Sequence, residues 1–111
     1  MHDKLLISIK VKKTIEYIEK ITNNYPKIEY VLKNKILDVC YELLELTYKA
    51  NIYHDKRYMK EILVKIRMIE YFVKKSIDKK LINFKKYENI GNHLLEINKM
   101  VNSWILCEKI K

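Results

Sequence analysis

Two stretches of the sequence place apolar residues alternately three and four positions apart, and this spacing limits the possible folds more than any other feature. They are Leu32, Ile36, Val39, Leu43, Leu46 and Ala50 in the first stretch, and Tyr87, Ile90, Leu94, Ile97, Val101 and Trp104 in the second. Residues at this spacing lie on one side of an α-helix. A single helix cannot bury such a stripe, so the chain must fold by packing helices against one another.

Two further stretches repeat the pattern less strictly. They contain Ile7, Val11, Ile15, Ile18 and Ile21, and Tyr58, Ile62, Ile66, Ile69, Val73 and Ile77. The sequence therefore predicts four helices at about 5–23, 29–50, 56–80 and 84–108. Asn-Asn-Tyr-Pro at 23–26 should end the first helix, because proline disfavours helical geometry in the residue before it. Asp55 and Asn83 are the expected N-caps of the third and fourth helices.

The composition favours an all-α fold. Glycine and proline occur once each in 111 residues, so the usual residues of tight β-turns are missing. Short connections between amphipathic helices make neighbours antiparallel. We expect a single domain over residues 1–111, folded as an up-down-up-down antiparallel four-helix bundle.

Positive charge is concentrated in the third predicted helix. The whole chain carries a formal charge of +9, and residues 51–80 hold nine basic and four acidic side chains. The candidate nucleic-acid-binding residues are Lys56, Lys60, Arg67, Lys74, Lys75 and Lys79. A localised positive field suits nucleic acid, an acidic protein or a membrane surface. The alternative is a solvated face in a lysine-rich protein.

Some apolar residues fall outside the stripes of the third and fourth helices. They are Val64, Met68, Tyr71, Phe72, Leu95 and Ile105. Because a monomeric bundle leaves such positions uncovered, they predict a homo-oligomer interface. The alternative is broader side-to-side packing within one bundle. Tyr53, Tyr58, Tyr71 and Tyr87 stand among lysines and could stack on unpaired bases, although core packing or subunit contact is the more common reason for such tyrosines.

No pattern in the sequence indicates catalysis. Paired Glu-x-x-His motifs, Ser/His/Asp or Cys/His arrangements and glycine-rich phosphate loops are missing, so we expect no enzyme, metal or cofactor. The cluster Asp38, Glu42 and Glu45 is expected to be solvated or paired with neighbouring lysines. Cys40 and Cys107 lie in helical apolar patterns and are expected to be buried and reduced. Without a signal peptide or a membrane span, the expected location is cytoplasmic.

Several short motifs follow one another in an order that is similar to a known family. They are Tyr-Pro-Lys at 25–27, DVCYELLEL at 38–46, Ile-Arg at 66–67, Tyr-Glu at 87–88 and EINKMVNSWI at 96–105. In this order they resemble the four-helix-bundle family of the accessory variability determinant (Avd) of diversity-generating retroelements and of the proteins encoded in ribosomal-RNA intervening sequences. The chain differs in having Asn-Ser at 102–103 in place of two glycines, and Tyr71 in place of a second arginine.

The resemblance implies a ring of five bundles that binds a reverse transcriptase and RNA or cDNA through a basic surface. It also implies that Arg67 and Lys74 contact the nucleic acid. The expected function is thus that of a non-enzymatic accessory protein in mutagenic reverse transcription. The alternative is a protein-interaction module of the intervening-sequence type.

Overall fold

Four long helices make up the computed structural model, which describes the backbone of residues 2–108 and the side chains of residues 6–108. The helices are α1 (His2–Thr22), α2 (Tyr30–Tyr53), α3 (Lys56–Asp78) and α4 (Phe84–Cys107), and a short 3-10 turn, η1 (Lys27–Glu29), precedes α2. No strand occurs within residues 2–108. The all-α prediction is therefore confirmed.

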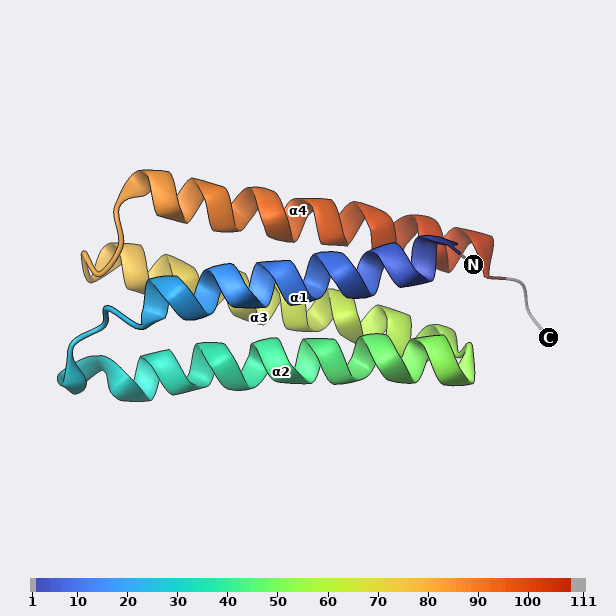
Figure 1. Ribbon diagram of the computed structural model, residues 1–111, viewed down its shortest axis with the longest axis horizontal. Helices are drawn as coiled ribbons and strands as arrows, with labels where there is room; N and C mark the ends of the chain where they lie inside the picture. The colour runs from blue at the N-terminus through green and yellow to red at the C-terminus, as the bar shows by residue number, and fades with distance from the viewer. Residues whose placement is uncertain (1, 109–111) are drawn as a thin grey trace.

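The helices alternate in direction and form a four-helix bundle (Figure 1). Each helix contacts two neighbours, in the order α1, α2, α3, α4 and back to α1, and α2 and α3 share the most extensive contact. The α1–α2 and α3–α4 connections lie at one end of the bundle, and the α2–α3 connection lies at the other (Figure 1). The up-down-up-down order follows from connections too short for a crossover.

Both predicted N-caps are present. The Asp55 carboxylate accepts a hydrogen bond from the backbone N–H of Arg57 at 2.8 Å, and Asn83 Oδ1 accepts one from that of Lys86 at 2.8 Å. The helix ends differ slightly from prediction. The second helix continues beyond residue 50 to Tyr53, where His54 adopts a left-handed conformation with φ 54°. The third helix ends at Asp78 rather than at residue 80.

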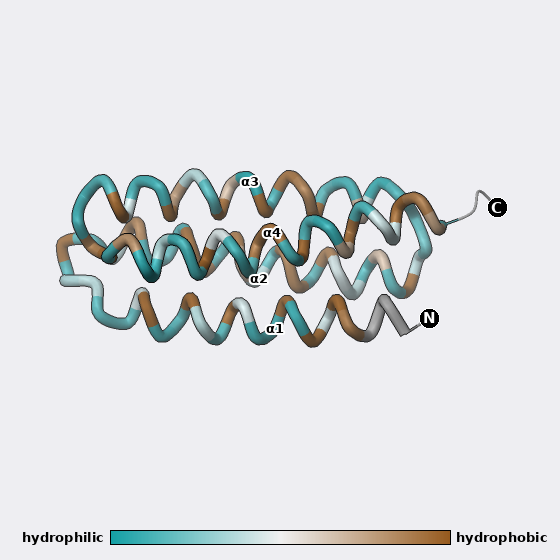
Figure 2. Tube along the Cα trace, turned by 90° about the horizontal axis from the view of Figure 1, so that it is seen from above, coloured by the Kyte–Doolittle hydropathy of each residue, from teal (hydrophilic) through white to brown (hydrophobic). Residues whose placement is uncertain are grey.

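The core lies along the bundle axis and contains the predicted stripe of α1 and, except for the partly buried Tyr87, that of α4. Figure 2 shows how hydrophobic and hydrophilic positions alternate along each helix. The largest fully buried side chains of the core include Ile7, Ile18, Ile36, Leu43, Met59, Ile62, Ile66, Ile69, Ile90, Leu94 and Ile97. Trp104 is also buried, as expected for a structural residue.

The buried stripes of α2 and α3 are displaced from the predicted ones. In α2, Cys40 and Thr47 are fully buried, whereas Val39 and Leu46 are only partly buried against the core. In α3, Met59 and Ser76 are buried. A stripe repeating every seven residues drifts around a helix of 3.6 residues per turn. Spacing therefore predicted the stripe but not its centre line.

Three buried hydroxyl groups are satisfied within their own helices. The Oγ1 of Thr22 donates to the carbonyl of Ile18 at 2.9 Å, and that of Thr47 donates to the carbonyl of Leu43 at 2.9 Å. Ser76 donates to Phe72 in the same way at 3.1 Å. Because each hydroxyl has a partner four residues earlier, its burial avoids most of the desolvation cost.

The prediction for the two cysteines was wrong for one of them. Cys40 is buried, but Cys107 is exposed in the last turn of α4. Trp104 already occupies the core position in this turn. Cys107 lies three residues further on and is exposed, so an apolar pattern alone overstated its burial.

Candidate nucleic-acid interface

The predicted cations lie along α3 or directly after it. Lys60, Arg67, Lys74, Lys75 and Lys79 are exposed and Lys56 is half-buried. Lys60, Arg67 and Lys74 recur every seven residues, so they project from one side of the helix about 10 Å apart. This spacing provides a line of positive charge along the bundle axis.

Three of these cations have acidic partners. Arg67 Nη1 lies 3.1 Å from Glu70 Oε1, Lys74 Nζ lies 2.7 Å from Asp78 Oδ1, and Lys79 Nζ lies 3.4 Å from Glu29 Oε2. Hydrogen bonding to Asp78, together with its charge, raises the pKa of Lys74. Because these pairs are exposed they contribute little stability, and a phosphate group could replace the carboxylate.

The other three cations make no ion pair with any residue in the described part of the chain. Lys56 and Lys60 are two of them. The third, Lys75, places its Nζ 5.4 Å from the centre of the Tyr71 ring. The α3 cations are therefore partly neutralised by neighbouring acids and partly available.

An apolar strip runs through the same face. Val64, Met68 and Tyr71 are 51%, 39% and 54% exposed, and they lie between the exposed cations on the outer side of α3. Residues predicted for nucleic-acid binding and residues predicted for self-association thus share one surface, which we call the α3 outer face: Lys60, Val64, Arg67, Met68, Tyr71, Lys74 and Lys75. The sequence indicated two separate sites, because the cations and the apolar residues differ in type although they share one side of the helix.

The remaining residues predicted for the oligomer interface divide into two groups. Leu95 of α4 is 51% exposed. Phe72 and Ile105 are partly buried and pack against the core of their own bundle. Broader packing within the bundle, the alternative considered above, therefore accounts for Phe72 and Ile105.

The tyrosines also separate by environment. Tyr58 and Tyr87 pack against the core, whereas Tyr53 and Tyr71 are 62% and 54% exposed. Only Tyr71 stands on the α3 outer face, where an unpaired base could stack on its ring.

Arg57 was not singled out from the sequence, although it too is exposed at the start of α3. It is 86% exposed and pairs with Asp55 at 2.9 Å, which raises its pKa. Lys65, in contrast, turns toward α2 and pairs with Glu42 at 3.1 Å. Pairing between the acidic cluster of α2 and lysines was one of the two expected outcomes, and it is confirmed for Glu42.

A protein-family comparison agrees with this architecture. The model of the bAvd-like family matches residues 5–108, nearly the whole chain. The chain belongs to the bAvd-like family. No curated protein matches its sequence.

This bAvd-like bundle has a second polar cluster, between α1 and α4. Lys10 Nζ lies 2.9 Å from His93 Nδ1 and 2.9 Å from Glu96 Oε1. The Tyr17 ring lies 5.3 Å from that of His93, and its hydroxyl accepts a hydrogen bond from Asn89. Burial and the Lys10 charge lower the pKa of His93, against an opposing effect of Glu96.

Two negative findings concern the described part of this bAvd-like protein. Residues 6–108 contain no group of three or more His, Cys, Asp or Glu side chains placed to hold a metal ion. Within the same described residues, none of the helices combines the length and the apolar character needed to span a bilayer.

Proposed function

We propose that this bAvd-like protein is a non-enzymatic accessory protein of a diversity-generating retroelement. In this function it binds a reverse transcriptase and RNA or cDNA during mutagenic reverse transcription. Family membership supports the accessory role. The α3 outer face supports nucleic-acid binding, because it combines cations with an exposed tyrosine.

The composition of the α3 outer face favours a single strand over a duplex. Lys60, Arg67 and Lys74 can contact phosphates along one strand, and such contacts give affinity without reading sequence. Tyr71 and Met68 offer apolar surface to unpaired bases, which a duplex keeps stacked inside. Single-stranded RNA and cDNA both present such bases.

Changing Lys60, Arg67 and Lys74 together to Glu should abolish the binding of a single-stranded RNA oligonucleotide. In the unaltered protein, affinity should fall steeply with added salt, since each phosphate contact releases a counterion, with a logarithmic slope of about −0.7 per contact. Fluorescence anisotropy at several salt concentrations measures both effects.

A matched control changes Lys13, Lys20 and Lys99 to Glu, three exposed lysines of α1 and α4. It alters the net charge equally, so it should weaken binding only modestly if the α3 outer face is the site. Binding that is absent, insensitive to salt or equally weakened by both variants would contradict the proposal.

The alternative function is a protein-interaction module of the intervening-sequence type. The ion pairs of Arg67, Lys74 and Lys79 favour it, because they reduce the charge available to phosphates. A reverse-transcriptase gene and a repeat pair beside the gene would favour the retroelement function.

A further inference from the structure

A groove between α3 and α4 lies beside the α3 outer face. It has a volume of about 350 Å³. Its lining includes Glu70 and Val73 of α3, and Tyr87, Glu88, Gly91 and Leu94 of α4. We call it the Gly91 groove. Its apolar floor and acidic rim distinguish it from the cationic surface next to it.

Gly91 is the only glycine of the chain and lies inside α4. A Cβ atom added there would meet no atom within 4 Å, so the bundle itself does not require a glycine. Glycine inside a helix is less favourable than alanine. The bare backbone leaves room for a group from outside the chain to approach α4 closely.

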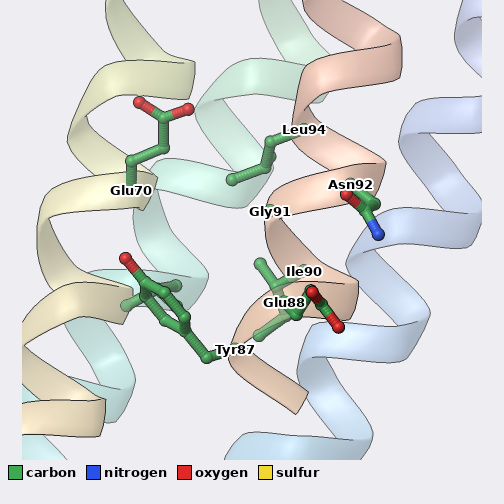
Figure 3. Close-up of a pocket in the computed structure, with 8 residues that line it drawn as sticks. Glu70, Tyr87, Glu88, Ile90, Gly91, Asn92 and Leu94 are labelled. Carbon is green, nitrogen blue, oxygen red and sulfur yellow. The ribbon is translucent and has the colours of Figure 1, made fainter. Parts of the chain in front are cut away.

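Two carboxylates flank this open position. The Glu70 side chain is 39% exposed and pairs with Arg67, an exposed residue that can turn away. Glu88 is exposed and makes no ion pair within residues 6–108. Figure 3 shows Tyr87 reaching from α4 toward α3 below Glu70, with Gly91 between Glu88 and Leu94.

Carboxylates beside an aromatic ring are suited to a cationic side chain. A guanidinium group can lie over a tyrosine ring and donate hydrogen bonds to carboxylates at the same time. The same carboxylates would repel phosphates, so nucleic acid does not fit this groove. The charge of an acidic groove is complementary to that of a basic polypeptide, even on a protein whose total charge is +9.

We propose that the Gly91 groove docks an arginine or lysine side chain of a basic protein partner. The aliphatic stem of that side chain crosses Gly91, and its charged end lies between Glu70 and Glu88, over the Tyr87 ring. The inference rests on the proposed function, in which a polymerase is held: it assigns this groove to the protein partner and leaves the α3 outer face to nucleic acid.

A single NMR signal reports on this groove. Labelling the protein with ¹⁵N-glycine yields one amide resonance, that of Gly91. The peptide acetyl-LRLRL-amide should shift this resonance in a saturable manner, whereas acetyl-LELEL-amide should not. Changing Glu70 and Glu88 together to Gln should weaken the peptide's affinity at least about fivefold, since both charged partners of its arginines are lost.

The matched control changes Glu16 and Glu45, exposed glutamates of α1 and α2, to Gln and should leave the affinity unchanged. Circular dichroism verifies that both variants remain folded. Equal shifts with the two peptides, no shift, or equal effects of the two variants would overturn the proposal.

Two further titrations identify other occupants. If self-association at high protein concentration prevents the peptide from shifting the Gly91 resonance, a second copy occupies the groove and the proposal is wrong. If a single-stranded RNA oligonucleotide shifts it as the basic peptide does, the groove belongs to the nucleic-acid surface and the proposal is wrong. If the unaltered protein binds no RNA but still shows the peptide shift, only the nucleic-acid part of the proposed function is contradicted.

Discussion

Cys40 and Cys107 carry the same thiol group in opposite surroundings. Burial, with a smaller effect of the Glu19 charge, raises the pKa of Cys40 to about 12. Cys107 is exposed. Since the thiolate is the reactive form, we expect one thiol of the native protein to react quickly with a chromogenic aromatic disulfide, and the second only after unfolding.

Absorbance of the released thiolate measures this reaction. Changing Cys107 to Ser should remove the fast phase and leave the slow one. Two fast thiols in the native protein would show that Cys40 is accessible and that the α2 stripe is placed wrongly.

His93 should make stability depend on pH. The pKa of its ring is lowered in the folded protein, chiefly by burial and then by Lys10. The unfolded chain therefore binds a proton more readily, and the free energy of unfolding should fall as pH drops through the usual histidine pKa of about 6.5. Below the folded pKa this loss should level off.

Urea denaturation of the unaltered protein and of the His93→Gln variant tests this effect. The variant lacks the titrating ring, so its stability should decline less between about pH 7 and pH 5. Parallel pH profiles for the two proteins would show that His93 does not titrate differently on folding.

At the scale of the helix, the caps could be predicted from sequence and the buried stripes only approximately. Asp55 and Asn83 bond to backbone groups two or three residues away, so their roles depend on local sequence. The centre of the α2 stripe depends on how α1 and α3 pack on either side. Cys40 rather than Val39 is central because of that packing.

Asn83 should stabilise the start of α4. Its side chain satisfies the backbone N–H of Lys86 at 2.8 Å, which would otherwise lack a helical partner. Changing Asn83 to Ala should reduce the free energy of unfolding by about 1 kcal/mol, measured by urea denaturation. Asn83→Asp should retain most of the stability, because aspartate caps equally well; an alanine variant as stable as the unaltered protein would disprove the role of the cap.

Only part of the candidate site could be predicted from the sequence of single helices. The seven-residue repeat of Lys60, Arg67 and Lys74 predicts that they share a side of α3. The ion pairs of Arg67 with Glu70 and of Lys74 with Asp78 depend on which rotamers the surroundings permit. The Gly91 groove has residues from two helices, so no single stretch of sequence indicates it.

For the whole molecule, we propose self-association into a homo-oligomeric ring, as the family resemblance implies. Light scattering should then give five times the 13.6 kDa of one chain. Changing Val64 and Met68 together to Gln should lower the mass, because both are exposed apolar residues of the α3 outer face.

Ile28 provides the control for this experiment, since it is 88% exposed but precedes α2 at one end of the bundle. Its change to Gln should leave the mass unchanged. A mass of one chain for the unaltered protein would contradict the ring, and dissociation by the Ile28 variant would place the contact elsewhere.

In the whole molecule, self-association and RNA binding would both use the α3 outer face. Val64 and Met68 lie among the cations proposed to bind nucleic acid, so subunit contact and RNA contact would compete for them. Measuring the mass with and without RNA shows whether the two compete: RNA bound only by the smaller species would mean that the surfaces overlap.

The sequence by itself determined the helices, their antiparallel order and the accumulation of positive charge on α3. These properties depend on spacing along the chain and on connections of a few residues. The tertiary structure alone decided which apolar residues are central, which cations have acidic partners, and where α3 and α4 leave a groove over Gly91. Such properties depend on atoms from different helices meeting at close range, and the angle at which two helices pack is not encoded in either one alone.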